Sequence, residues 1–168
     1  MKSIISQVNS GIAGEFYVAA ELTKRGYVAS LTSKNTKAID LLASNEDGSK
    51  VVSIQVKTSK NSTEFTLSEK DEKIEYNDSL FYVFVNLNIK ENKGQIEYGS
   101  VDYYVVPMKK VKDFIYKKHR DWLNAPGKHG QAHNDSTMRK YCIQPDDELN
   151  NFDILGLKSN TVDDGLSV

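Results

Sequence analysis

The chain has 168 residues, of which 39% are hydrophobic and 27% charged, with 10 glycines and 3 prolines. This composition excludes a collagen-like or low-complexity polymer and predicts a globular domain with an apolar core. The only cysteine, Cys142, can neither form a disulfide within the chain nor supply a thiolate zinc site. No segment has a signal-peptide core or the ~20 apolar residues of a membrane span. We therefore expect a cytoplasmic protein without membrane association.

The net charge of -1 is unevenly distributed along the chain. Residues 1–144 carry 21 Lys and Arg against 17 Asp and Glu, whereas residues 145–168 carry one lysine and six acids. This pattern predicts a single, mildly basic domain over 1–144 and an acidic C-terminal tail over 145–168. Such a tail is more often solvated than folded onto a basic surface. A nucleic-acid partner remains open.

The first predicted element is a helix over 10–25, with Ser10 as its N-cap and Gly26 as the left-handed residue that ends it. At about 100° per residue, its apolar side chains, Phe16 among them, share one broad arc, and Glu15 falls within that arc. A carboxylate on an apolar face carries a desolvation cost unless a cation, a metal ion or a donor meets it. Glu15 is therefore a candidate functional residue.

Three strands are expected next, over 27–33, 38–44 and 50–59, with an Asp-Gly hairpin turn between the second and the third. Side chains alternate along a strand, so Gln55 and Lys57 should share one face of the third strand.

The second half of the chain continues with a short polar helix over 68–76, a buried strand over 80–87 and one or two strands over 95–106. Pro107 then begins a helix at its first turn. Beyond Asn124 the pattern is weak. The order of elements predicts an α/β fold with a mixed central β-sheet flanked by helices.

The polar residues of the first half occur in a distinctive order: Gly14-Glu15 on a helix, Ala38-Ile39-Asp40 in a strand, and Gln55-Val56-Lys57-Thr58 in the strand after the hairpin. This order resembles the PD-(D/E)xK nuclease superfamily. It is most similar to the branch of Holliday-junction-resolvase-like and Mrr-like enzymes, many of which have a glutamine where Gln55 stands. The resemblance covers roughly the first half of the chain and implies a restriction-endonuclease-like fold and a metal-dependent DNA endonuclease.

The resemblance also assigns roles. Mg²⁺ or Mn²⁺ would be held by Asp40, the amide oxygen of Gln55 and the backbone carbonyl of Val56, with Glu15 binding directly or through water. Lys57 would orient or deprotonate the attacking water and stabilise charge on the phosphate. The chain departs from the family pattern in lacking the proline before Asp40 and in having Gln55 for an acid, which should weaken metal binding. A structural ion pair between Glu15 and Lys57 is an alternative.

Candidate DNA-phosphate contacts are Lys34, Lys37 and Lys60 near the site, and Lys117 and Lys118 on the helix that follows Pro107. A homodimer, which duplex-cutting relatives often form, is left open.

Two other functions remain. One is a catalytically inactive nuclease-fold module that binds nucleic acid or a protein partner. The other, less favoured, is a metal site at His119, His129 and His133, where His129-x-x-x-His133 has zinc-like spacing but no accompanying glutamate.

Overall fold

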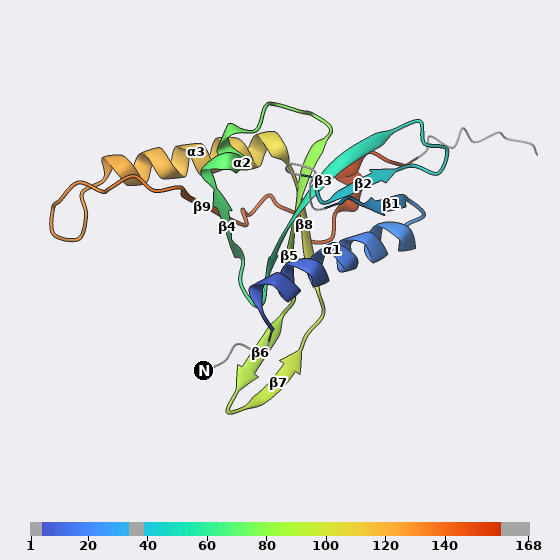
Figure 1. Cartoon of the computed structure of the whole chain (residues 1–168), viewed down its shortest axis with the longest axis horizontal. Helices are drawn as coiled ribbons and strands as arrows, with labels where there is room; N and C mark the ends of the chain where they lie inside the picture. The colour runs from blue at the N-terminus through green and yellow to red at the C-terminus, as the bar shows by residue number, and fades with distance from the viewer. Residues whose placement is uncertain (1–4, 34–38, 159–168) are drawn as a thin grey trace, which may run out of the picture.

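The computed structural model describes residues 5–33 and 39–158, which form a mixed α/β domain (Figure 1). The elements in chain order are α1 (Gln7–Lys24), β1 (Val28–Leu31), β2 (Leu41–Ser44), β3 (Val51–Ser59), β4 (Glu64–Ser68), α2 (Glu69–Lys73), β5 (Leu80–Asn86), β6 (Ile89–Asn92), β7 (Gln95–Tyr98), β8 (Asp102–Pro107), α3 (Met108–Asn124), β9 (Met138–Cys142) and a 3₁₀ turn (Phe152–Leu155). Among the described residues, no helix combines the length and hydropathy needed to cross a membrane.

Five strands form the central sheet in the order β1-β2-β3-β5-β8, in which β3 and β5 are parallel and the other neighbours antiparallel. Helix α1 covers one face, while α3 and the β4–β9 pair pack on the other (Figure 1). The predicted fold class, a mixed central sheet flanked by helices, is confirmed.

Strict alternation along the strands separates two apolar cores. On β5, Phe81, Val83 and Val85 enter the core under α1, and Tyr82 and Phe84 enter the core under α3. On β3, Val52 and Ile54 belong to the α1 core. Because side chains alternate, Gln55 and Lys57 share the opposite face, as predicted.

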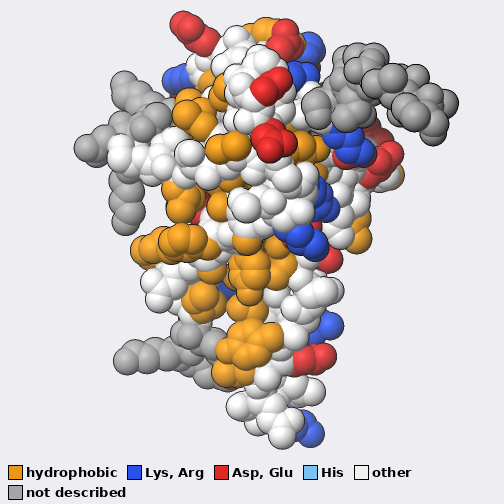
Figure 2. Space-filling model, turned by 90° about the vertical axis from the view of Figure 1, so that its right-hand side faces the viewer, with side chains coloured by type: hydrophobic (Ala, Val, Ile, Leu, Met, Phe, Trp, Pro, Cys, Tyr) orange, Lys and Arg blue, Asp and Glu red, His pale blue; other side chains and the backbone are white. Residues whose placement is uncertain are grey.

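Helix α1 begins earlier than predicted, and a different side of the helix faces the sheet. Its N-cap is Ser6, whereas Ser10 is buried inside the helix. The buried stripe is Ser10, Gly14, Val18 and Leu22. Phe16 was expected on that side and is 59% exposed. The reason is close approach to β3: a Cβ at position 14 would lie 1.9 Å from Thr58 Oγ1, so the helix side with the smaller residues faces the sheet. Figure 2 shows hydrophobic side chains grouped on the side of the molecule that faces right in Figure 1.

Two short strands, β6 and β9, were not predicted from the sequence, whereas β7 and β8 agree with the one or two strands expected over 95–106. The hairpin β6–β7 is largely exposed and turns through Lys93 and Gly94, both with positive φ. Strand β9 pairs with β4 and follows a segment in which the pattern was weak. Neither region shows the sustained alternation of a half-buried sheet, because long-range pairing forms these strands.

The C-terminal segment is packed as far as Lys158. Phe152, Leu155 and Leu157 are buried against the α1 core. Gly156 ends the 3₁₀ turn in the left-handed conformation. The expectation of a solvated tail is therefore wrong for residues 145–158. The expectation rested on net charge, which does not register the three apolar side chains that anchor this segment to the core. The rest of the predicted tail lies outside the described residues.

This packing predicts a large effect of truncation at Phe152, which is 1% exposed. Phe152→Ala should lower the free energy of unfolding by about 3–5 kcal/mol, the usual cost of removing a buried aromatic ring. Ile154→Ala, at a 42% exposed position of the same turn, is the matched control and should cost much less. Urea denaturation measures both, and equal midpoints for the two variants would contradict a packed C-terminal segment.

Candidate functional site

The candidate site lies where β2 and β3 cease to pair. Leu41 at the start of β2 is opposite Ile54, whereas β3 continues alongside β5 as far as Ser59. Asp40 stands immediately before β2. Its backbone N–H donates to the Ile54 carbonyl at 2.8 Å, and its Oδ2 accepts from the Val56 N–H at 2.7 Å. These two bonds hold the Asp40 carboxylate against β3 at the open end of the sheet.

The backbone of Val56 faces the same opening. In a β-strand the N–H and C=O of one residue point to the same edge, and this direction alternates from residue to residue. The Ile54 carbonyl and the Val56 N–H both meet Asp40 on the β2 side. The Val56 carbonyl therefore also points to that side, beyond the first residue of β2.

Gln55 contributes an unusual oxygen. Its Oε1 is buried and accepts no hydrogen bond from any described residue. Leaving a buried acceptor unsatisfied costs roughly 1–3 kcal/mol, so native structures rarely do so without a reason. A cation at this position would satisfy the oxygen. Together with the Asp40 carboxylate and the Val56 carbonyl, it makes a set of hard oxygen donors that fits Mg²⁺ or Mn²⁺.

The surroundings of the Asp40 carboxyl disfavour its ionised form. Burial raises its pKa, and the nearby negative charge of Asp71 raises it further. The hydrogen bond from Val56 and the charge of Lys57 act in the opposite direction but do not cancel the rise. A half-buried carboxylate that is costly to ionise is common at functional sites, and a bound cation would offset this cost.

Lys57 shares the face of Gln55, and its partner is Asp71. The Lys57 Nζ lies 3.3 Å from Asp71 Oδ1, and its side chain is only 22% exposed. Asp71 belongs to α2 and was missed as a site residue, because its position three residues after Ser68, at the start of the predicted polar helix, is typical of a helix cap. That capping box is present. The alternative of a structural ion pair for Lys57 thus has Asp71, rather than Glu15, as the observed partner.

Glu15 is placed differently from the other candidates. It is half-buried on α1 and follows Gly14, which packs on Thr58. Thr58 lies on the α1 face of β3, opposite Lys57. The structure thus brings the side chains of Asp40, Gln55 and Lys57 together with the backbone carbonyl of Val56, while the Val56 side chain packs on the α1 face and Glu15 comes from α1 itself. Its participation in metal binding stays a prediction.

The candidate DNA contacts divide into three groups. Lys34 and Lys37 lie outside the described residues. Lys60 is half-buried directly after β3. On α3, Lys117 is exposed, whereas the Lys118 Nζ lies 3.8 Å from Glu64 Oε2.

Most other cations of α3 are already paired. Lys109 contacts Asp113, Lys110 contacts Asp146 and Asp147, and Arg120 contacts Glu72. The basic exterior that the sequence suggests for this helix is therefore largely neutralised within the chain.

The histidine metal site is not supported. No group of three or more His, Cys, Asp and Glu within the described ranges could hold a metal ion. His119 instead contacts Asp135 at 2.7 Å, and His133 stacks on Trp122 with ring centroids 4.3 Å apart. The Asp40 site is of a different kind, since its other oxygens come from an amide and a backbone carbonyl.

The raised pKa of Asp40 gives a test of pH dependence. Between the ordinary value of 3.8 and the folded value, the folded chain binds more protons than the unfolded chain, so stability falls as pH rises through this window. Asp40→Asn keeps an acceptor for Val56 and removes the charge. It should raise the melting temperature at pH 7 without metal, by roughly 2–4 °C if the cost is about 1 kcal/mol. The gain should vanish below pH 3.8.

Asp47→Asn is the control of opposite sign, because hydrogen bonds from Ser49 lower the pKa of Asp47. This variant should not gain stability at pH 7. Scanning calorimetry of both variants from pH 3 to pH 8 decides; a lower melting temperature for Asp40→Asn at pH 7 would mean that the site does not strain its carboxylate.

Comparison with known proteins gives only distant similarities. No protein-family model matches the chain, and no curated protein matches it in sequence. Among solved structures, it is similar to Hjc, a Holliday junction resolvase from Archaeoglobus fulgidus, with 15% identity and a TM-score of 0.43 over 79% of this chain and 83% of that one. It is also similar to a bacterial homing endonuclease, with 17% identity and a TM-score of 0.41 over 62% of this chain and 67% of that one.

Proposed function

We propose that this chain is a metal-dependent DNA endonuclease that hydrolyses phosphodiester bonds at the site formed by Asp40, Gln55, Val56 and Lys57. The observation that carries the proposal is the buried Gln55 Oε1, which lacks a partner among the described residues. It comes from the residue next to Val56, whose N–H binds the Asp40 carboxylate. A purely structural glutamine at this depth would be expected to have its oxygen satisfied.

Each residue has a distinct task in this proposal. A bound Mg²⁺ or Mn²⁺ would neutralise charge on the scissile phosphate and make water acidic enough to attack near neutral pH. Asp40 supplies the charged ligand, held in place by the Val56 N–H before any metal arrives. Gln55 and the Val56 carbonyl add neutral oxygens. Lys57 holds an ammonium group on the same face, where it stabilises charge that develops on the phosphate during cleavage.

The charge balance of the site favours weak metal binding. Asp40 is the single carboxylate in the proposed ligand set on the strands, and Gln55 adds no charge. Gln55→Glu should therefore tighten Mn²⁺ binding while Asp40→Ala removes it. Glu15 would support the metal directly or through water. DNA as partner, a homodimer and a cytoplasmic location complete the proposal.

The central test is cleavage of linear, nicked and four-way-junction DNA with Mg²⁺ or Mn²⁺. Lys57→Ala should lower the cleavage rate by at least ~100-fold and change DNA affinity only a few-fold, because its charge acts mainly in the transition state. Asp40→Ala should abolish cleavage. Lys70→Ala, at an exposed lysine of α2, is the control and should cleave normally. If Lys57→Ala still cleaves within a few-fold while affinity collapses, Lys57 is a phosphate clamp and the proposed role is wrong.

A second candidate function is a nuclease-fold module that binds nucleic acid or protein without cleaving. The observation in its favour is the Lys57–Asp71 ion pair, which engages the lysine in the absence of DNA. Wild-type protein that binds DNA but leaves all three substrates intact with either metal would establish this alternative.

The different surroundings of Lys117 and Lys118 on α3 lead to a separate prediction about DNA binding. Each lysine that contacts a phosphate releases about one counterion from the DNA and thereby changes the slope of log affinity against log salt by about one. Lys117→Ala should reduce the slope by about that amount. Lys118→Ala should change it less, because Glu64 already serves as its counter-charge. A fluorescence-anisotropy salt titration on one duplex measures both; unchanged slopes would place the DNA away from α3.

A further inference from the structure

We infer that Asp71 is the positioning residue for Lys57, holding its ammonium group at the face where the proposed metal ligands lie. The inference rests on the proposed function of the site and adds to it a group from α2, an element outside the strand pattern on which the site is built. Asp71 is 6% exposed, so its carboxylate needs a defined set of partners.

The hydrogen bonds of Asp71 distinguish a positioning role from metal binding. Oδ2 accepts from the backbone N–H of Ser68 at 2.7 Å and from its hydroxyl at 2.8 Å. Oδ1 accepts from the Tyr82 hydroxyl at 3.0 Å and lies 3.3 Å from the Lys57 Nζ. A carboxylate offers about four lone-pair positions, and these contacts use all of them. Asp71 is thereby a holder of Lys57 and not a further ligand for the cation.

Three of the four contacts fix Asp71 independently of Lys57. The bond from the Ser68 N–H belongs to the capping box that begins α2, and the Ser68 hydroxyl donates to the same carboxylate oxygen. The third comes from Tyr82, which is 1% exposed and lies opposite Gln55 in the β3–β5 register. Lysine has a flexible four-carbon stem, and a carboxylate fixed in advance reduces the freedom of its ammonium group. An ammonium group has three donors, so contact with one carboxylate oxygen leaves it able to donate to a phosphate.

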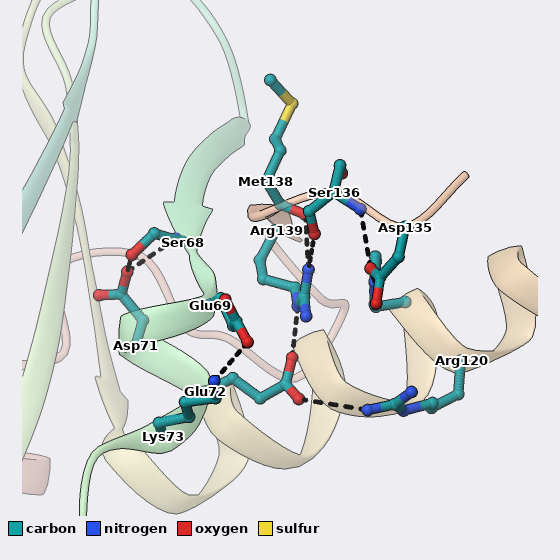
Figure 3. A network of polar contacts seen from close by, with 11 residues as sticks. Ser68, Glu69, Asp71, Glu72, Lys73, Arg120, Asp135, Ser136, Met138 and Arg139 are labelled. Atoms are coloured by element: carbon teal, nitrogen blue, oxygen red, sulfur yellow. Dashed lines mark hydrogen bonds and ion pairs between the residues drawn. The ribbon is translucent and has the colours of Figure 1, made fainter. Parts of the chain in front are cut away.

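Helix α2 itself is anchored from a distance. Glu72, next to Asp71, forms an ion pair with Arg139 of β9 and lies 3.9 Å from Arg120 of α3 (Figure 3). Arg139 also donates to the Ser136 carbonyl at 2.7 Å. Figure 3 shows Asp71 turned toward Ser68 and Glu72 turned toward the arginines. This arrangement ties the position of Lys57 to α3 and β9, elements far from β3 in the sequence.

The ionisation state of Asp71 agrees with this role. Burial by itself would raise its pKa, but the charge of Lys57 and the hydrogen bonds from Ser68 and Tyr82 outweigh burial and lower it. Asp71 is thus ionised at neutral pH.

The chain contains a matched control for a purely structural role. Asp147 is also buried and accepts from a lysine, a tyrosine hydroxyl and a backbone N–H: Lys110, Tyr141 and Gln144. It follows β9 and contacts Lys110 in the first turn of α3, outside the proposed site. Substitution of either aspartate removes a buried anion from a Lys–Tyr pair, so both should lower stability, and only Asp71→Asn should affect catalysis.

The experiment compares Asp71→Asn with Asp147→Asn in cleavage kinetics and thermal unfolding. Asp71→Asn should lower kcat by about 10- to 100-fold with KM within a few-fold, the scale expected when a reacting group loses its alignment. Asp147→Asn should keep kcat within about twofold at a similar loss of melting temperature. Equal kcat values for the two variants would overturn the inference.

A second measurement does not depend on activity. A ¹H–¹⁵N correlation selective for lysine ammonium groups should show a protected signal in the wild type that is missing in Lys57→Arg, lost in Asp71→Asn and kept in Asp147→Asn. The lack of a protected Lys57 signal in the wild type overturns the inference even if the enzyme is active or Asp71→Asn fails to fold. Failure of the wild type to cleave any DNA overturns the proposed function, while the ammonium signal still decides whether Asp71 holds Lys57.

Discussion

The register between β2 and β3 is the constraint on which the candidate site depends. Leu41 is paired with Ile54, and both are fully buried under α1. Because side chains alternate along a strand, a slip of one residue would turn Asp40 to the opposite face from Gln55 and Lys57. The hairpin turn reinforces the register, since the Asn45 side chain accepts from the Lys50 N–H and Gly48 adopts a positive φ of 71°. Apolar burial on one face thus sets the polar chemistry on the other.

The site carries costs that the rest of the domain offsets. Asp40 is half-buried with a raised pKa, and Gln55 has an oxygen without a partner among the described residues. Natural proteins accept such local costs at functional sites, because a well-packed core elsewhere keeps the chain folded. Here the two cores flank the sheet, and β5 serves both with a fully buried strand. The same strand presents Tyr82 to Asp71, so the core under α3 also supports the position of Lys57.

Ion pairs within the chain, more than the net charge of each segment, determine which charged side chains are available for binding. The helix α3 is rich in lysine, yet Lys109, Lys110 and Lys118 each contact a carboxylate. In the acidic C-terminal segment, Asp147 receives bonds from Lys110 and Tyr141 and helps to fix the chain onto the domain. Within residues 5–33 and 39–158, Lys117 is one of the cations of α3 that no carboxylate pairs, so the proposed phosphate contacts depend on such cations rather than on the total charge of the helix.

The sequence by itself determined the main strands of the central sheet, the presence of the three helices and the shared face of Gln55 and Lys57. Alternation and caps are local, and the first half of the chain shows them clearly. Only the tertiary structure decided which side of α1 is buried, because the close contact of Gly14 with Thr58 outweighs the apolar arc that contains Phe16. It also decided the pairing of β9, the burial of Phe152 and the partner of Lys57. Asp71 is 14 residues from Lys57 and reads in the sequence as a capping residue; packing of α2 against the sheet brings the two together, and no local pattern encodes that contact.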